Sequence, residues 1–429
     1  MDFLLLATFS TAQAPRKLAV KDLPPSAFKL ISIKVSGSNR FSPNDVIAAT
    51  GLRVGETATD DDFKTASRHL ADSGAFSNVA YNFVYSTEGT TLGFDVTDAA
   101  LFAPAQFDNF VWLSDQELRE TLHTQVPLFQ GELPLSGDLP DQVSAALQTT
   151  LALRHIPGQV DYLRAAHNDG PIEAFVFSVK GVNLLVRNID FTGALPAELP
   201  SLQAASTKML GQDYSRSILR TQAEIDLLAV YLTRGYLKAK IDDAQAKVIE
   251  TDPEKTTVDV TFPVNPGRQY KLTGVQWSGN QAFPAQKLQA LIREQVGQPL
   301  NLVQFREDLD NARKLYGTLG YMTATLVPGE QFEEAQAAVS LQIEVHEGDV
   351  YRMGDLEIRG LDSRTTAQVT NAWKLRGGDP YDSSYPTTFL EACSKELSQM
   401  GQWNTTFHET LNQKDRTVDV SVRFDPASR

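Results

Sequence analysis

Cysteine is almost absent from this sequence of 429 residues, which contains only Cys393. A single thiol can form neither a disulfide within the chain nor a zinc site built from thiolates. Phe389, Cys393 and Leu397 recur at helical spacing, so we expect Cys393 to be a small buried apolar side chain. The sequence thereby excludes internal disulfide cross-links and cysteine-based metal cages.

Positive charge is also in short supply. The chain has 39 Lys and Arg against 53 Asp and Glu, giving a net charge of -14 and a pI near 5.0. Proteins that bind nucleic acid need a basic face for the phosphates. We therefore expect no nucleic-acid partner, and we attribute the acidity to solubility.

Long apolar runs are missing as well. No stretch approaches the roughly 18 apolar residues that a membrane-spanning helix needs, so we expect no direct membrane span in this chain. Phe3 to Phe9 is a short apolar run, and Ala12-Gln13-Ala14 resembles a signal cleavage site, but Asp2 has the wrong charge. A secretory signal with a misassigned or shortened start and a simple apolar tail both stay open for residues 1–28.

Spacings typical of catalysis or metal binding are not found. Asp60-Asp61-Asp62 fits the first turn of a helix, whose dipole favours acidic residues. The glycines lack phosphate-loop and dinucleotide spacings, and no nucleophile elbow occurs. No two of the six histidines lie within four residues of each other: His69, His123, His155, His167, His346 and His408. We therefore expect no enzymatic activity, no metal and no cofactor.

The sequence does contain an internal repeat. Four glycine pairs share one offset of 81 positions, and a shared offset of this size indicates a row of similar small domains. The pairs are Gly267 with Gly348, Gly279 with Gly360, Gly297 with Gly378, and Gly320 with Gly401.

One copy, residues 266–347, illustrates the expected order β-α-α-β-β. Alternating and helical apolar spacings, with Gly and Pro breaks between them, place the elements. The expected elements are a strand Tyr270–Ser278, a helix from Phe283 through Val296, a helix from Asn301 through Tyr316, and strands Met322–Val327 and Ala338–His346 joined by an acidic hairpin at Gly329–Glu334.

The spacing predicts five such units. Their ranges are 29–98, 101–181, 182–265, 266–347 and 349–425. The second unit is the most divergent, because Ile156-Pro157-Gly158 replaces the Gly-aromatic ending of the second helix. Its expected elements are a strand Phe107–Leu113, helices Asp115–His123 and Asp141–Leu153, and a hairpin of Val160–Ala165 with Ala174–Val179. Short turns separate the units, which predicts an elongated array of neighbours in contact.

This pattern resembles the POTRA (polypeptide-transport-associated) repeat, and five units resemble the periplasmic region of the BamA-type outer-membrane barrel-assembly insertases. The resemblance implies an α+β fold: a tandem array of five small domains, each a three-stranded mixed sheet covered by two helices. Its motifs, which we expect to be structural, are the strand–Gly residues Gly37, Gly193, Gly279 and Gly360, the helix breaks Gly55, Gly211, Gly297 and Gly378, and the closures Gly235-Tyr236, Gly320-Tyr321 and Gly401.

The chain departs from that family after its last predicted strand, Val418–Phe424, which only five residues follow. Family members continue there into a transmembrane barrel, which needs at least eight strands of about ten residues. A stand-alone protein without a barrel and the N-terminal fragment of a split or truncated barrel-assembly protein both stay open.

The resemblance implies a periplasmic protein, on the inner side of the outer membrane, that takes part in outer-membrane protein assembly. A sheet edge offers unpaired N–H and C=O groups to an extended segment, and the resemblance implies that the second strand is the edge used. The implied partners are unfolded outer-membrane protein precursors and assembly lipoproteins or an insertase. An alternative is a scaffold that docks folded lipoproteins or an insertase through helix faces. The candidate contacts are Val79, Tyr81, Phe83, Val160, Tyr162, Lys238, Lys240, Thr323, Thr325, Thr405 and Phe407.

Overall fold

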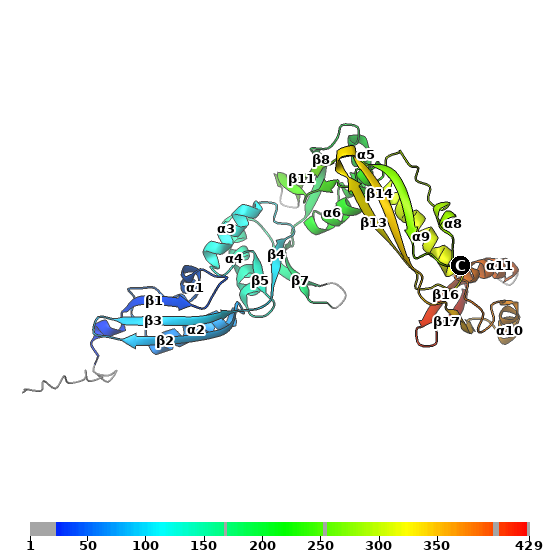
Figure 1. The fold of residues 1–429 in the computed structure, drawn as a ribbon. Helices are drawn as coiled ribbons and strands as arrows, with labels where there is room; N and C mark the ends of the chain where they lie inside the picture. The colour runs from blue at the N-terminus through cyan, green and yellow to red at the C-terminus, as the bar shows by residue number, and fades with distance from the viewer. Residues whose placement is uncertain (1–22, 167–169, 252–254, 398–402, 427–429) are drawn as a thin grey trace, which may run out of the picture. The chain divides into compact units, whose positions relative to one another are not determined.

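The computed structural model describes residues 23–166, 170–251, 255–397 and 403–426 (Figure 1). The apolar run Phe3–Phe9, the following cleavage-like tripeptide, His167 and Gly401 lie outside the described residues. The chain divides into two compact units, residues 1–188 with 209–219 and 245–260, and residues 189–208 with 220–244 and 261–429. Among the described residues, no helix combines the length and the apolar character needed to cross a membrane.

Five small sheets organise the described residues, which confirms the predicted α+β class. We call each sheet, together with the helices between its strands, a module, and number the modules 1 to 5 along the chain. Modules 1, 4 and 5 have the expected three strands, and their last strand is central. It pairs in parallel with the first strand and antiparallel with the second. In Figure 1, β3 accordingly lies between β1 and β2.

The elements of these three modules are as follows. Module 1 contains β1 (Leu30–Ser36), α1 (Pro43–Ala49), α2 (Asp60–Asp72), β2 (Phe76–Tyr85) and β3 (Thr90–Asp98), after a 3-10 turn at Pro25–Phe28. Module 4 contains β12 (Lys271–Ser278), α8 (Ala285–Gln289), α9 (Leu302–Gly317), β13 (Thr325–Glu333), a 3-10 turn at Glu334–Gln336, and β14 (Ala338–His346). Module 5 contains β15 (Arg352–Arg359), α10 (Ser363–Ala372), α11 (Tyr385–Leu397), β16 (Trp403–Asn412) and β17 (Thr417–Pro426).

Modules 2 and 3 each add a short strand to the expected three. The order in module 2 is β5-β4-β7-β6, and in module 3 it is β10-β11-β8 with β9 also paired to β11. Module 2 contains β4 (Phe102–Phe107), α3 (Asp115–Gln125), β5 (Glu132–Pro134), α4 (Leu139–Leu153), β6 (Gln159–Ala166) and β7 (Ile172–Lys180). Module 3 contains β8 (Leu184–Thr192), α5 (Leu199–Ser206), a 3-10 turn at Thr207–Met209, α6 (Arg216–Gln222), a π-helical turn at Ala223–Leu227, α7 (Leu228–Leu232), β9 (Lys240–Ile241), β10 (Gln245–Thr251) and β11 (Thr256–Asn265).

Side-chain caps start several of the helices. The Ser42 hydroxyl accepts a hydrogen bond from the backbone N–H of Asp45 at 3.1 Å. The Asp62 carboxylate accepts the Thr59 N–H at 2.8 Å, and Asn301 accepts the Gln304 N–H at 3.0 Å. These caps satisfy backbone donors that the first helical turn leaves without partners.

Each sheet buries one face under its helices. In β14, buried and more exposed positions alternate, and Leu341 and Ile343 are fully buried. Phe305 and Tyr316 of α9 are buried in the same cluster. The ring of Tyr321 stands edge-on to that of Tyr316, with centroids 6.0 Å apart. This closing aromatic therefore packs against the second helix, as Tyr236 does against Tyr231 at 5.8 Å.

A close backbone approach explains the strand–Gly motif. Gly37, Gly193, Gly279 and Gly360 all have positive φ, between 76° and 93°. A Cβ atom at any of them would overlap the carbonyl oxygen of the central strand, at Val96, Val264, Val345 and Phe424 respectively. Glycine is required at these positions on both counts, since other residues disfavour positive φ.

Asn109 occupies the same position in module 2. Phe107 pairs with Phe177, and the Asn109 side chain accepts the Val179 N–H at 2.7 Å and donates to its carbonyl at 3.0 Å. Module 2 has no glycine of the strand–Gly motif to show where its first strand ends. The predicted first strand Phe107–Leu113 is therefore wrong. The strand is β4, Phe102–Phe107, and the following loop buries Phe110 and Leu113.

Two boundaries in module 4 also differ from the prediction. The strand predicted to end at Val327 is β13, which continues to Glu333, so most of the expected acidic hairpin is strand. The turn follows at Glu334–Gln336, where Ala337 adopts φ 50°. The helix expected to reach Val296 ends at Gln289, and beyond it the Arg293 N–H donates to the buried Asp308 carboxylate at 2.8 Å.

Replacing Asn109 by alanine should weaken module 2 locally. Two hydrogen bonds to Val179 would be lost, which costs about 1–3 kcal/mol in the free energy of opening. Amide hydrogen exchange at Val179 measures that energy. Glu173→Ala, an exposed change on the same sheet, should stay within about 0.5 kcal/mol of the parent chain. Equal protection of Val179 in both variants would contradict the structural role of Asn109.

Candidate functional site

Every module has two sheet edges, and at one of them the start of the first strand is hydrogen-bonded to the segment between the two helices. In four modules the loop between the two helices bonds to that strand through a repeated glycine N–H. The four bonds run from Gly55 to the Leu30 carbonyl at 2.7 Å, Gly211 to Val186 at 2.8 Å, Gly297 to Leu272 at 2.7 Å, and Gly378 to Met353 at 2.8 Å. In module 2, β5 takes this place, with Phe102 paired to Pro134 and Ala103 to Leu133.

The edge of the second strand is open. β2, β6, β10, β13 and β16 are each the last strand in their sheet, and no further strand pairs with them within the part of the chain that the structure describes. Unpaired N–H and C=O groups on the outer side of such an edge strand can pair with an extended segment from another chain.

The hairpin of module 1 determines which residues of β2 point outward. Ser86 and Gly89 exchange two backbone hydrogen bonds, of 3.0 and 3.2 Å. Bonded and non-bonded pairs alternate along an antiparallel ladder, so the next pair, Tyr85 with Thr90, is a non-bonded one. The same alternation makes Val79, Tyr81 and Phe83 non-bonded, so their N–H and C=O groups point away from β3. These are the three residues predicted as contacts in this module.

Their side chains turn toward the helices. The Tyr81 hydroxyl donates to Asp60 at the start of α2 at 3.2 Å, and the rings of Phe83 and Phe63 lie 5.1 Å apart. Module 2 repeats the arrangement, since the Tyr162 hydroxyl donates to Asp141 at 2.8 Å. Burial and the neighbouring carboxylate raise the pKa of both phenols. The edge strand is thus anchored by its side chains while its backbone stays accessible.

The other predicted contacts divide into two groups. Val160 and Tyr162 lie in β6, Thr405 and Phe407 in β16, and Thr325 begins β13. Thr323 and Lys238 precede their strands, and Lys240 belongs to the two-residue β9. The prediction that Lys238 and Lys240 lie on the edge strand of module 3 is therefore mostly wrong, because that edge strand is chiefly β10. The chain leaves the ladder after Ile241 and rejoins it at Gln245.

Lys238 instead lies at the junction of modules 3 and 4. It forms an ion pair with Glu334, and its ammonium group is 4.1 Å from the centre of the Phe332 ring. The Tyr270 hydroxyl donates to the same carboxylate at 2.8 Å. The hydrogen bonds from Lys238 and Tyr270 lower the pKa of Glu334. Sequence reasoning missed this cluster because Lys238 and Glu334 are 96 positions apart.

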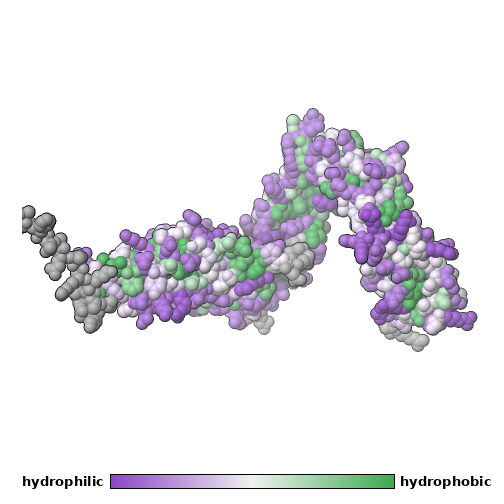
Figure 2. Space-filling model, turned by 60° about the horizontal axis from the view of Figure 1, so that its bottom comes forward, coloured by the Kyte–Doolittle hydropathy of each residue, from purple (hydrophilic) through white to green (hydrophobic). Residues whose placement is uncertain are grey.

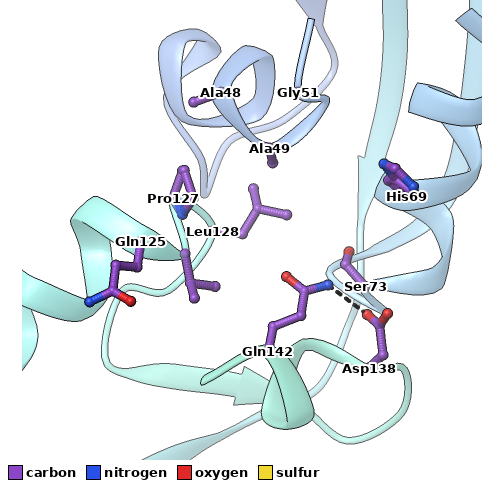
Figure 3. Close-up of a pocket in the computed structure, with 11 residues that line it drawn as sticks. Ala48, Ala49, Gly51, His69, Ser73, Gln125, Pro127, Leu128, Asp138 and Gln142 are labelled. Carbon is purple, nitrogen blue, oxygen red and sulfur yellow. Dashed lines mark hydrogen bonds between the residues drawn. The ribbon is translucent and has the colours of Figure 1, made fainter. Parts of the chain in front are cut away.

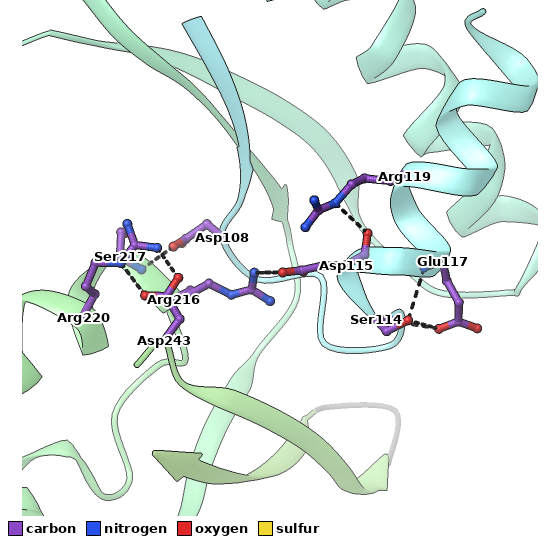
Figure 4. Close-up of polar contacts among 9 residues, drawn as sticks. All are labelled: Asp108, Ser114, Asp115, Glu117, Arg119, Arg216, Ser217, Arg220 and Asp243. Atoms are coloured by element: carbon purple, nitrogen blue, oxygen red, sulfur yellow. Dashed lines mark hydrogen bonds and ion pairs between the residues drawn. The ribbon is translucent and has the colours of Figure 1, made fainter. Parts of the chain in front are cut away.

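A second set of polar contacts joins modules 2 and 3 (Figure 4). Asp108 accepts the Ser217 N–H at 2.8 Å and the Ser215 hydroxyl at 3.1 Å. Arg216 donates to both oxygens of Asp115 at 2.9 Å. Burial alone would lower the pKa of Arg216, but the contacts with Asp115 outweigh it and raise the pKa. The first turn of α6 is thus held by two aspartates of module 2.

A cavity of about 410 Å³ lies between modules 1 and 2 (Figure 3). Its lining combines apolar side chains such as Leu128 with polar ones such as His69, and Gln142 donates to Asp138 at 2.9 Å. Within the described ranges, no group of three or more His, Cys, Asp or Glu residues is placed to hold a metal ion.

The Lys238–Glu334 cluster should weaken on acidification. Because the pKa of Glu334 lies below its ordinary value of 4.5, its stabilising contribution is complete above that pH and is lost as the pH falls through the lowered pKa. Lys238→Met should therefore lower the thermal unfolding midpoint at pH 7, and this difference should shrink as the pH falls below 4.5 and through the lowered pKa of Glu334. Arg306→Met, at an exposed site, serves as the control. A midpoint difference that does not change with pH would contradict the assignment.

Comparison with known proteins supports the repeat. Residues 270–348 match the POTRA family model, described as a surface antigen variable number repeat. An outer membrane protein assembly factor of Treponema pallidum (strain Nichols) is 27% identical over 217 residues, covering 49% of this chain and 26% of that protein. Outer membrane protein assembly factor BamA of Neisseria meningitidis serogroup B is 21% identical over 259 residues, covering 57% of this chain and 32% of that protein.

Among solved structures, a crystal structure of POTRA domains 3–5 of BamA from Haemophilus influenzae aligns with a TM-score of 0.44 and 19% identity. The alignment covers 56% of this chain and 96% of that one. The chain spans 26% and 32% of the length of the two assembly factors. The resemblance predicted from the glycine spacing is confirmed by the match of residues 270–348 to the POTRA family model.

Proposed function

We propose that this chain takes part in outer-membrane protein assembly on the periplasmic side of the outer membrane. In this proposal the second-strand edges bind extended segments of unfolded outer-membrane protein precursors or of assembly partners. The supporting observation is an asymmetry of the sheets: the inter-helix loop or β5 is hydrogen-bonded to the start of the first strand, whereas within the described residues no further strand pairs with the second strand. No catalytic step is part of the proposal.

The names of the relatives support the assembly role. Both proteins are named as outer membrane protein assembly factors, and each aligns with about half of this chain. The similarity covers only part of those proteins, so their activity and partners enter here as a proposal for this chain.

The energetics of edge binding fit transient capture. Each backbone hydrogen bond contributes about 0.5–1.5 kcal/mol net. Four or five such bonds contribute about 2–7.5 kcal/mol, and the cost of ordering the segment reduces this, so a single site binds at best in the micromolar-to-millimolar range. Backbone pairing depends little on side-chain identity, which suits many different clients. Several edges on one chain raise retention through effective concentration, while each single site still releases quickly.

A second candidate function is a scaffold that docks a folded assembly partner, such as a lipoprotein or an insertase. The cavity between modules 1 and 2 favours it, because it offers a preformed concave surface (Figure 3). On the face drawn in Figure 2, hydrophilic residues dominate and hydrophobic ones gather in separate patches. A folded partner would use such patches and the cavity, and would leave the second-strand edges free.

A spin-labelled peptide of ten residues, alternating apolar and polar, distinguishes the two functions. Edge binding should broaden NMR signals of outward-facing amides such as those of Val79 and Tyr81 in β2. The same peptide N-methylated at alternate amides is the matched control, since it cannot pair on that side and should bind at least about tenfold more weakly. Broadening confined to helices or to the cavity lining, or no binding at all, would refute edge capture.

A further inference from the structure

We propose that Pro328 closes the second-strand edge of module 4, so that extended segments are bound at the edges of modules 1, 2 and 5 and not along β13. This inference rests on the proposed function and adds to it by naming which edges are active. It follows from comparing one equivalent residue in the edge strands of modules 1, 2, 4 and 5.

The position is defined by strand pairing. In module 1, Val35 lies two residues before Gly37 and pairs with Phe94, which pairs with Tyr81. In module 4, Trp277 lies two residues before Gly279 and pairs with Ile343, which pairs with Pro328. Tyr81 and Pro328 are therefore equivalent residues of their edge strands.

Modules 2 and 5 extend the equivalence. In module 5, Ile358 lies two residues before Gly360 and pairs with Val422, which pairs with Phe407. In module 2, Phe107 lies two residues before Asn109 and pairs with Phe177, which pairs with Tyr162. Three of the four equivalent positions thus carry an aromatic residue, and module 4 alone among them carries proline.

The backbone of this position points outward. The hairpin bonds of module 1 place the Tyr81 N–H on the open side of β2, away from β3. By register, the nitrogen of Pro328 points to the open side of β13. The β13–β14 ladder agrees, because its nine pairs from Thr325 with His346 to Glu333 with Ala338 run without a register shift. Proline cannot donate a ladder hydrogen bond, so an unbroken ladder accommodates it where its nitrogen faces away from the paired strand.

Proline at this position removes what an incoming strand requires. The residues of β13 whose backbone groups point to the open side are Leu326, Pro328, Glu330 and Phe332. Pro328 therefore lies among the residues with which an incoming strand would pair. It has no N–H, and its ring occupies the space where the carbonyl of a visiting strand would approach. The exposed side chain of Pro328 leaves that ring at the surface. Proline on an edge strand is a known protection against unwanted pairing.

The spin-labelled peptide described above tests the inference on the 429-residue chain. In the parent protein, amides of β2, β6 and β16 should broaden, and those of β13 should not. Pro328→Thr restores one N–H at an exposed site, so β13 amides should then broaden, with binding there at least about tenfold tighter than in the parent. The other edges should keep their affinity.

The matched test in module 5 uses Phe407→Pro and Phe407→Thr. Both lose the aromatic ring, but only the proline variant loses the outward N–H, so only Phe407→Pro should weaken binding at β16 by about tenfold. Far-UV circular dichroism checks that both variants fold. Equal binding to β13 in the parent chain, or no gain in Pro328→Thr while β2 and β16 still bind, overturns the inference and leaves the proposed function intact. No binding at any edge overturns the proposed function instead.

Discussion

This structure depends on one constraint: the backbone N–H and C=O groups at the edges of very small sheets need hydrogen-bond partners. A sheet of three or four strands has a large share of its peptide groups at its two borders. Here one border receives hydrogen bonds from the loop between the helices, through glycines such as Gly55 and Gly297. That loop can reach the strand only because the two helices are separate, which explains why a helix pair, and not one long helix, follows each first strand.

The same backbone bonding links consecutive modules. The Tyr270 N–H donates to the Gly235 carbonyl at 2.7 Å, and the Tyr351 N–H donates to the Gly320 carbonyl at 2.8 Å. The carbonyl of a glycine that ends the second helix of one module therefore accepts a hydrogen bond from the residue just before the first strand of the next module. Side-chain ion pairs reinforce the junction of modules 3 and 4, through Lys238 with Glu334, and join modules 2 and 3, through Arg216 with Asp115. Folding of one module and attachment of the next consequently share residues.

How far the sequence predicted this structure depended on the kind of signal. Glycines with steric requirements, such as Gly279, and caps such as Asn301 act locally, so their spacing predicted the class and most elements of modules 1, 4 and 5. Asn109 achieves the same closure by side-chain hydrogen bonds and leaves no glycine to recognise. The Lys238 cluster depends on a partner 96 positions away, and the orientation of Pro328 depends on ladder register. Neither property is visible without strand pairing.

The orientation of the edge strand separates two roles along one stretch of chain. In β2 the side chains of Tyr81 and Phe83 contribute to the core, whereas the N–H and C=O groups of the same residues form no ladder hydrogen bonds with β3. The sheet of module 1 therefore forms without hydrogen bonds from those groups. A single substitution at such a position can therefore change the number of active borders without breaking a hydrogen bond of the sheet, so that its effect on stability is limited to the packing of the replaced side chain.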